Sequence, residues 1–381
     1  MDKKVFYLGY YDIPAYAAEK RNAPPAAVTK INYVISVLNR LGCSVMMMSP
    51  AATTDKSSAR PRTVPLDDQN QLRVFRCIGG RNKIASLLRF VWLKLSLIFS
   101  FLTHVRSDDF VFVYHSPEYM RTLLFLKKLI RFRLILEVEE IYADVTGVDK
   151  IRKKEFRVFR RADAFILSTE LLEERINTRK VPSCVSYGTY TIPQKQEKTP
   201  FEDGKIHCVY AGTFDHHKGG AQLAVKTAQY LSEEYHMHIL GFGTYEDTRA
   251  LKEEIARISR LTQATITFEG MLTGSDYLDF ISRCDIGLST QLADGSFNET
   301  SFPSKILSYF TNGLQVVSVP LRVLKCSALD PYIEYFTEYT PQAVAEAIRR
   351  IRQSDPQSVI RVIQTLDASF GENLRRLLSG S

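Results

Sequence analysis

Two lysines stand next to residues that typically begin helices, and these positions are the ones best suited to bind an anion. Lys305 follows Pro303 and Ser304, and Lys218 precedes two glycines. The first N–H groups of a helix have no partner inside the helix and carry a partial positive charge, worth about 0.3–1 kcal/mol to an anion. A lysine ammonium there adds a charge-assisted hydrogen bond of roughly 1.5–3 kcal/mol. The sequence therefore predicts a phosphate site formed by Lys218, Ser304 and Lys305.

The segment that leads to Lys218 has the composition of a buried strand followed by a close turn. Residues 206–211 form an apolar run, and Gly212 and Thr213 come directly after it. A glycine at such a turn lets a phosphate approach the backbone closely. A lysine followed by glycine is also an ordinary strand-to-helix connection, and that alternative stays open for this loop taken alone. Two such loops in one half of the chain favour the phosphate site.

The run from Phe302 to Phe310, followed by Gly313 and an apolar strand, resembles the donor-site helix of bacterial glycosyltransferases of family four. These include the enzymes of capsule, O-antigen and exopolysaccharide synthesis. The loop from Gly212 to Lys218 resembles the phosphate loop of the same family, with threonine where many members have arginine. The resemblance implies an α/β chain of the GT-B fold, in which two Rossmann-like domains with parallel sheets face a central cleft. It also implies a retaining, metal-independent transfer from a nucleotide diphosphate sugar, with a UDP-sugar favoured.

The family's acidic signature is incomplete in this chain. Many members carry a glutamate five residues before the glycine that ends the donor-site helix, and a second glutamate eight residues earlier. Those places hold Ser308 and Thr300, and Glu299 is one residue out of register. We therefore take Glu299 as the candidate to bind sugar or ribose hydroxyls. The departure keeps open a noncatalytic nucleotide-sugar-binding subunit, and an epimerase or phosphorylase of the same fold is a further alternative.

Three more residues are predicted to contact the donor. Residues 268–272 resemble the family's segment whose backbone contacts the nucleotide base, which gives Gly270 and Leu272. Gly9 ends the first apolar run of the chain and is the third, although a single glycine is no dinucleotide fingerprint. The donor is a substrate, so no cofactor and no metal ligand is predicted.

Two candidates for the chemistry at the sugar follow apolar runs in the first half of the chain. His115 follows residues 109–114, where the family often places a histidine beside the transferred sugar; the alternative is a histidine that only caps a strand. Glu140 belongs to a cluster of carboxylates after residues 133–138 and is the candidate to orient or deprotonate the acceptor hydroxyl. A solvated strand end is its alternative. Because carboxylates this close repel one another, at least one needs a cationic partner, a ligand hydroxyl or a raised pKa.

The length of 381 residues suits two domains, and strand-like and helix-like runs alternate throughout, which is typical of parallel sheets. We predict an acceptor-side domain over residues 1–191, a polar linker over 192–205 and a nucleotide-sugar domain over 206–355. Residues 356–381 are predicted to form a helix that returns towards the first domain. Residues 51–71 have the composition of a long surface loop.

The net charge of +8 is compatible with nucleic acid or with an anionic membrane surface. Residues 81–106 contain no acidic residue and combine basic with long apolar side chains, without a nucleic-acid reader motif. Their longest uncharged part, residues 95–105, is shorter than the ~18–20 residues that cross a bilayer. We therefore predict that residues 81–106 lie on an anionic membrane surface and that nucleic acid is no partner. A buried domain helix is the alternative, and both readings are compatible.

The expected compartment follows from the cysteines and from the N-terminus. The six cysteines lie far apart and no pair has metal-ligand spacing, which indicates reduced thiols and no zinc site. The chain begins without the apolar core of a signal peptide. We expect a cytoplasmic protein, peripheral on the inner face of the membrane, whose acceptor is a lipid-linked or surface glycan.

Overall fold

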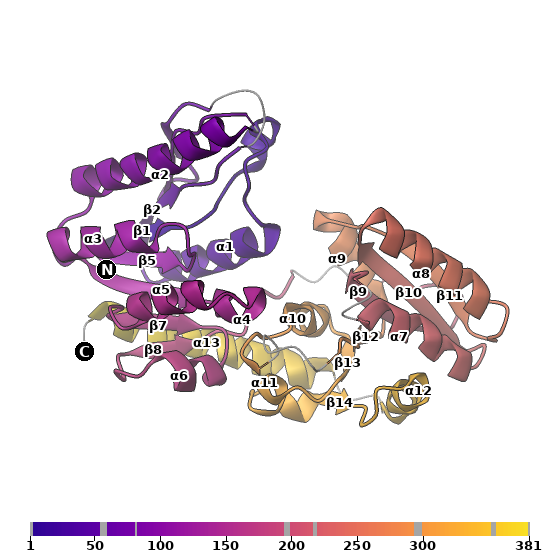
Figure 1. Ribbon diagram of the computed structural model, residues 1–381. Helices are drawn as coiled ribbons and strands as arrows, with labels where there is room; N and C mark the ends of the chain where they lie inside the picture. The colour runs from indigo at the N-terminus through magenta and orange to yellow at the C-terminus, as the bar shows by residue number, and fades with distance from the viewer. Residues whose placement is uncertain are drawn as a thin grey trace. The chain divides into compact units, whose positions relative to one another are not determined.

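The computed structural model describes residues 3–53, 59–80, 82–193, 199–215, 219–292, 299–351 and 356–379. The chain divides into two compact units. Unit 1 comprises Met1–Thr189 and Ala368–Ser381, and unit 2 comprises Tyr190–Asp367. The second division falls inside the last helix, α13 (Pro356–Ser379), so this helix contributes to both units (Figure 1).

Unit 1 is built on an eight-stranded sheet with the order β3-β4-β2-β1-β5-β6-β7-β8. All neighbouring strands run parallel except β3 and β4, which are antiparallel. The strands are β1 (Lys3–Leu8), β2 (Cys43–Ser49), β3 (Arg62–Pro65), β4 (Gln71–Val74), β5 (Phe110–Tyr114), β6 (Arg133–Val138), β7 (Ala164–Leu167) and β8 (Ser183–Val185). The prediction of a long surface loop over residues 51–71 was wrong in part, because β3 lies there. Its short, polar sequence carries no apolar alternation; pairing with β4 makes it a strand.

The helices of unit 1 pack against this sheet and bury its apolar side chains (Figure 1). They are η1 (Pro14–Glu19), α1 (Pro25–Arg40), α2 (Lys83–His104), α3 (Met120–Ile130), α4 (Tyr142–Thr146), α5 (Asp149–Phe159) and α6 (Glu170–Ile176). Parallel strands covered on both faces are apolar almost throughout, and the residues of β5 and β7 accordingly are nearly all buried. The C-terminal half of α13 completes the unit, because Phe370 stacks on Tyr33 of α1 with 5.6 Å between ring centroids.

Unit 2 contains a six-stranded, fully parallel sheet with the order β11-β10-β9-β12-β13-β14. Its strands are β9 (Ile206–Thr213), β10 (Tyr235–Phe242), β11 (Thr265–Gly270), β12 (Ile286–Ser289), β13 (Gln315–Ser318) and β14 (Ile333–Tyr335). Its helices are α7 (Gly220–Thr227), η2 (Ala228–Tyr230), α8 (Tyr245–Ile258), α9 (Gly274–Arg283), α10 (Ser304–Thr311), α11 (Arg322–Lys325), η4 (Asp330–Tyr332) and α12 (Pro341–Arg350). The alternation of strand and helix predicted for this half of the chain is confirmed.

Helix α2 has one buried face and one exposed face. Leu97 and Phe101 are fully buried in the core of unit 1, whereas Leu87 and Phe99 are mostly exposed. By length and composition alone, α2 is long and apolar enough to cross a membrane. The sequence prediction that it is too short considered only residues 95–105, and the complete helix is longer. Of its most apolar window, 28% is buried inside unit 1, so α2 contributes to the core of the domain with one face only.

Candidate functional site

The sheet of unit 2 has a topological switch point between β9 and β12. From β9 the chain adds β10 and β11 on one side of the sheet and then β12, β13 and β14 on the other. In open α/β sheets, ligands bind beyond the carboxyl ends of the strands at such a point. The loop after β9 leads to α7, and the segment after β12 leads to α10. Both predicted anion-binding loops therefore leave from the two strands that define the switch point.

Tyr309 of α10 joins these two strands where they separate. β9 and β12 pair over only two residues each. Beyond that pairing, the Tyr309 hydroxyl accepts a hydrogen bond from the Ala211 N–H at 2.9 Å and donates one to the Leu288 carbonyl at 3.3 Å. A Cβ on Gly287 would lie 2.3 Å from the Tyr309 ring, so only glycine fits below it. Tyr309 thereby fixes α10 against the switch point.

The Lys305 side chain extends from the first turn of α10 to the end of β9. Its ammonium lies 4.5 Å from the centroid of the Tyr210 ring and 3.1 Å from the place that a Cβ on Gly212 would take. Pro303 occupies the N-cap position, and among the described residues no side chain caps the helix. Ser304 is exposed. The start of α10 thus places backbone N–H groups and an ammonium beside a glycine, which is the arrangement that binds a phosphate.

The loop with Lys218 meets the same place, although Lys218 itself lies outside the described residues. Gly219 has a φ of 65°, in the left-handed region that favours glycine. A Cβ on Gly220 would lie 3.0 Å from the Tyr210 hydroxyl, and a Cβ on Gly212 would lie 3.1 Å from the same oxygen. Tyr210 therefore packs against both ends of the β9–α7 loop, and the Lys305 ammonium of α10 lies over the same ring. That Lys218 and Lys305 share one anion stays a prediction.

The remaining predicted donor residues of unit 2 occupy different places at this edge. Thr213 ends β9 and is half-buried. Gly270 ends β11 with a φ of 72°, and Leu272 follows it, half-buried. In the sheet order, β11 is separated from β9 by β10, so Gly270 and Leu272 lie further from the switch point than Thr213.

The places of the family's two glutamates are occupied by hydroxyl groups. The Ser308 hydroxyl shares a hydrogen bond with the Tyr277 hydroxyl at 3.1 Å. Thr300 is buried, whereas Glu299 beside it is exposed. Of the residues at these places, Glu299 therefore has the carboxylate that is accessible to a ligand.

In unit 1 the corresponding switch point lies between β1 and β5, and Gly9 and His115 follow these strands. A Cβ on Gly9 would lie 2.9 Å from the Ile31 side chain and 3.1 Å from the Tyr114 Cβ. Close packing of helix and strands therefore requires glycine at position 9. This requirement is structural and does not depend on a bound ligand.

The His115 side chain is enclosed by the protein. It is 2% exposed, and its ring centroid lies 5.3 Å from that of Tyr142 and 5.1 Å from that of Phe159. Burial lowers the pKa of His115 to about 3, so the imidazole is neutral at physiological pH. Its Nε2 lies 3.6 Å from Glu155, whose carboxylate accepts the Tyr142 N–H at 2.8 Å. The ring contacts the residues that hold the start of α4, and a direct contact with a sugar would require it to rotate.

Three carboxylates, those of Glu137, Glu139 and Glu140, lie at the end of β6 and directly after it, and they have a cationic partner, as their close spacing required. Lys30 of α1 is 4% exposed, and its ammonium lies 3.5 Å from the Glu139 carboxylate. Burial raises the pKa of Glu137 to about 7, while the positive charge of Lys30 acts in the opposite direction. The Tyr7 hydroxyl donates a hydrogen bond to Glu137. Glu140 is half-exposed, so the three carboxylates occupy different environments.

The sequence analysis did not identify Lys30, which lies at the carboxyl edge of the unit 1 sheet. Its ammonium donates to the Ser186 carbonyl at 2.8 Å, to the Ser186 hydroxyl at 2.9 Å and to the Gly188 carbonyl at 3.0 Å. The available signal was its position in α1, on the same face as the buried Ile31 and Val34. A lysine inside an apolar helical face has to find buried acceptors.

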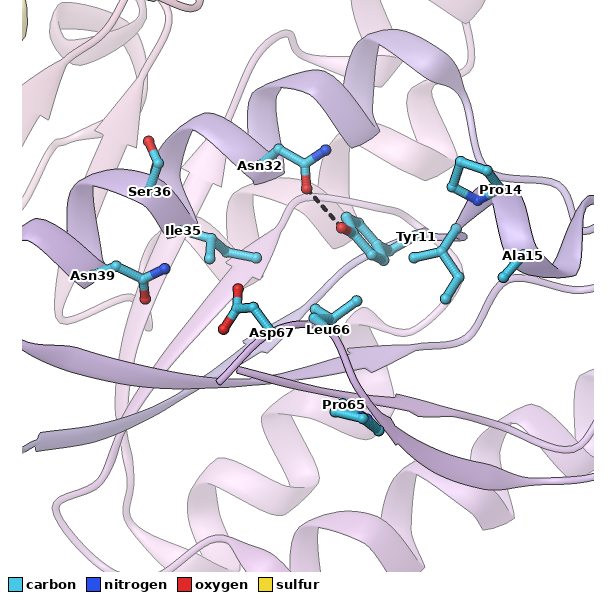
Figure 2. A pocket seen from close by; sticks show the side chains of 11 residues that line it. Tyr11, Pro14, Ala15, Asn32, Ile35, Ser36, Asn39, Pro65, Leu66 and Asp67 are labelled. Atoms are coloured by element: carbon cyan, nitrogen blue, oxygen red, sulfur yellow. Dashed lines mark hydrogen bonds between the residues drawn. The ribbon is translucent and has the colours of Figure 1, made fainter. Parts of the chain in front are cut away.

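Unit 1 also contains a cavity of about 450 Å³ between α1 and the turn from β3 to β4 (Figure 2). The Tyr11 hydroxyl donates to the Asn32 amide oxygen at 2.6 Å at one side of this cavity. Polar groups of Ser36, Asn39 and Asp67 line it together with apolar side chains. This mixture of amides, hydroxyls, a carboxylate and an aromatic ring is suited to a polyhydroxylated ligand.

Comparison with known proteins identifies the fold. No protein-family model matches the chain, and no curated protein sequence matches it. Among solved structures, sucrose-phosphate synthase from Thermosynechococcus elongatus is 12% identical with a TM-score of 0.67, covering 100% of both chains. An α,α-trehalose-phosphate synthase (UDP-forming) from Burkholderia xenovorans, in complex with glucose-6-phosphate, is 10% identical with a TM-score of 0.69, covering 99% of this chain and 100% of its own.

A third solved structure, Anabaena HepE in complex with UDP, is 11% identical with a TM-score of 0.66 and covers 100% of both chains. The two synthases are glycosyltransferases of the GT-B fold. At this level of identity the likeness defines the fold, and the predicted architecture of two Rossmann-like domains is confirmed.

Proposed function

We propose that this chain is a glycosyltransferase that takes its sugar from a nucleotide diphosphate sugar, with a UDP-sugar favoured. The observation that carries the proposal is the Lys305 ammonium at the start of α10, beside Gly212 at the switch point of unit 2. The structural neighbours support the choice of base, because one is named UDP-forming and another was solved with UDP.

The arrangement at α10 is suited to the departure of a diphosphate. Cleavage of the bond between sugar and phosphate leaves negative charge on the nucleotide, and fixed positive groups lower the barrier when they lie where that charge develops. Lys305 and the first N–H groups of α10 supply them, together with Lys218 and Ser304. We therefore propose a metal-independent reaction that retains the configuration of the sugar. Glu299 is the candidate to bind hydroxyls of the donor.

The acceptor side is assigned to unit 1. The cavity of Figure 2 offers the Asn32 and Asn39 amides and the Ser36 hydroxyl, which match the donors and acceptors of a sugar. Glu140 remains the candidate to orient or deprotonate the acceptor hydroxyl, since it is half-exposed. His115 acts as a positioning residue, because its buried ring supports the start of α4.

We also propose that the acceptor is lipid-linked and that unit 1 lies on the cytoplasmic face of an anionic membrane. Helices α2 and α3 pack together and contain no acidic residue. They carry ten of the twenty large, exposed apolar side chains among the described residues: Ile84, Leu87, Leu88, Phe90, Val91, Leu95, Phe99, Leu102, Phe125 and Leu129. Basic residues including Lys83, Arg121 and Lys128 are exposed on the same helices. Apolar side chains with surrounding cations are typical of helices that bind an anionic surface.

The donor is tested by thermal unfolding with UDP-, GDP- and dTDP-sugars. A bound donor raises the melting temperature by mass action, and we expect the largest rise with a UDP-sugar. Mass spectrometry with donor and a lipid-linked glycan then tests transfer, which enlarges the acceptor by one sugar residue. An isomerised donor with an unchanged acceptor identifies an epimerase, and a sugar phosphate formed from free phosphate identifies a phosphorylase. Donor binding without any product identifies a noncatalytic subunit.

Membrane binding is tested separately by sedimentation with vesicles of phosphatidylglycerol or of phosphatidylcholine. We expect the protein to sediment with the anionic vesicles and Phe99→Glu to remain in solution, because Phe99 is 60% exposed on α2. Leu261→Glu is the matched control, since Leu261 is 59% exposed on unit 2. If both variants sediment as the wild type does, α2 is not the membrane-binding surface.

A further inference from the structure

A cluster of three histidines lies within unit 2, on β9 and β10. His207 is the second residue of β9, and His236 and His238 are the second and fourth residues of β10. Residues two apart on a strand point to the same face, and His207 pairs with His236 in the sheet. One nitrogen atom from each ring lies within 4.8 Å of the corresponding atoms of the other two. His207 and His238 are both buried, and His236 is half-buried.

The hydrogen bonds of His207 and His238 need one more proton, or a metal ion in its place, than two neutral imidazole rings provide. His207 Nε2 lies 2.8 Å from the Asp203 carboxylate, His238 Nδ1 lies 2.8 Å from the Glu269 carboxylate, and His207 Nδ1 lies 2.8 Å from His238 Nε2. An ionised carboxylate only accepts, so each outer bond uses the single N–H of a neutral imidazole. Two lone pairs then face each other between the rings. This row of hydrogen bonds, from Asp203 through His207 and His238 to Glu269, is satisfied only when a proton or a metal ion is added between the two rings.

The third histidine distinguishes between these two possibilities. His236 Nδ1 is buried and has no hydrogen-bond partner among the described residues, and the nearest carboxylate oxygen, from Asp203, is 3.6 Å away. A proton shared between His207 and His238 needs only their two nitrogens and gives His236 Nδ1 no role. A transition-metal ion binds three imidazole nitrogens readily. Apart from its 3.6 Å ion-pair contact with Asp203, His236 Nδ1 brings a third imidazole nitrogen close to the two that face each other, and such a set of three favours a metal ion.

We propose that His207 Nδ1, His236 Nδ1 and His238 Nε2 bind a divalent transition-metal ion, with Zn²⁺ the first candidate. The opposite nitrogens already have the partners that metal-bound histidines typically have, namely Asp203, Glu269 and the Thr267 hydroxyl at 2.7 Å from His236 Nε2. With Zn–N bonds of about 2.0–2.1 Å, tetrahedral ligand atoms lie roughly 3.4 Å apart. Binding thus requires the 2.8 Å contact between His207 and His238 to open slightly. It also requires the His236 ring, which stacks on His238 with 4.0 Å between centroids, to turn so that its Nδ1 points to the ion.

The position of the cluster indicates a structural metal. It lies towards the amino ends of β9 and β10, whereas the proposed donor site lies at the carboxyl ends. Phe201 stacks on His207 with 4.0 Å between ring centroids, and the Arg283 guanidinium lies over Phe201. The metal would therefore hold residues 199–205, which precede the first strand of unit 2, against the sheet and α9. This inference is independent of the proposed function.

Metal content tests the proposal directly. The chain is prepared without a polyhistidine tag, stripped of metal with a chelator and then loaded with Zn²⁺. After gel filtration has removed the excess metal, inductively coupled plasma mass spectrometry measures the number of ions per chain. We expect one ion per chain in the wild type and in His104→Gln, because His104 belongs to α2 of unit 1 and is none of the three proposed ligands. We expect loss of that ion in His236→Gln and in His238→Gln. Asp203→Asn should weaken binding by about 10–100-fold, because Asp203 supports a ligand.

Two further measurements exclude a folding artefact. His236→Gln leaves the bond between His207 and His238 in place, so in chelator its melting temperature should match that of the stripped wild type; Zn²⁺ should raise only the wild-type value. Co²⁺ should give the visible absorption of tetrahedral nitrogen coordination in the wild type alone. If the wild-type chain contains no metal after loading with Zn²⁺, the proposal is wrong, and a proton shared by His207 and His238 remains the explanation. Equal metal in the wild type and in His236→Gln also overturns it.

Discussion

Lys30 in unit 1 and Lys305 in unit 2 both lie at the carboxyl edge of a parallel sheet next to a switch point. They differ in burial and in the groups that their ammonium contacts. Lys30 is buried and donates to three oxygens of Ser186 and Gly188. Lys305 is half-buried over the Tyr210 ring, beside glycine and at the start of a helix. The first lysine donates to backbone and side-chain oxygens of its own chain, and the second is the lysine that we propose to bind the donor's phosphate.

The residues around each lysine explain the difference. In unit 1 the edge is filled by side chains, with Tyr7 bonded to Glu137 and His115 enclosed by aromatic rings. In unit 2, Gly212 and Gly220 leave room for the Tyr210 ring, and the Lys305 ammonium lies over that ring beside the start of α10. The same topology therefore carries a closed set of hydrogen bonds at the edge of unit 1 and the proposed anion site at the edge of unit 2.

Lys30→Met should give the largest effect, on stability. Three oxygens of Ser186 and Gly188 would lose their donor and the half-buried Glu139 its cation. At about 1–3 kcal/mol for each unsatisfied group, we expect a loss of about 3–5 kcal/mol in the free energy of unfolding, measured in urea. Lys153→Met, at an exposed position of α5, is the control and should change little. Donor binding by the folded fraction should be unchanged. Wild-type stability in Lys30→Met would show that unit 1 does not depend on this lysine.

Glu137 should make the stability of unit 1 depend on pH. Its pKa is raised from 4.5 to about 7 in the folded chain, so the folded state holds the proton over a range where the unfolded state has released it. The free energy of unfolding should therefore fall as pH rises between these values, by on the order of 3 kcal/mol. Glu137→Gln should remove this fall, measured as urea unfolding at pH 5 and at pH 8. An equal slope in Glu137→Gln and in the surface variant Glu253→Gln would contradict the assignment.

Lys305→Met should have the opposite profile to Lys30→Met. We expect donor affinity to fall by about tenfold to a hundredfold, because a charge-assisted hydrogen bond to phosphate is lost. Its free energy of unfolding should fall by only about 0.5–1 kcal/mol, because the contact of the ammonium with the Tyr210 ring is lost. Calorimetric titration with the donor measures the first quantity. Lys226→Met, at an exposed position of α7, should bind the donor as the wild type does.

Tyr309→Phe should lower stability less than Lys30→Met does and donor affinity less than Lys305→Met does. The Ala211 N–H would lose its buried acceptor, which costs about 1–3 kcal/mol of stability. Because Tyr309 also fixes α10 at the switch point, donor affinity should fall, though less than in Lys305→Met. Unfolding in urea and calorimetric titration measure the two changes. Unchanged donor affinity in this variant would show that Lys305 is placed without help from Tyr309.

The sequence by itself determined the fold class and the place of the proposed donor site. Helix α10 begins at Ser304 and is followed by Gly313 with a φ of 79°, as proline, serine and glycine at their spacing predicted. These signals are local: a periodicity, a helix start and a glycine constrain only the few residues around them. They therefore survive in the sequence even where no family model matches.

Only the tertiary structure decided which distant polar groups meet. It brought Lys30 to Ser186, joined β9 to β12 through Tyr309, and placed His207 beside His236 and His238. A buried polar group has to find its partner, but the partner is selected by strand order and helix packing, which spacing along the chain does not reveal. The chemistry of each switch point therefore follows from three-dimensional neighbours, although the residues that supply it are already present in the sequence.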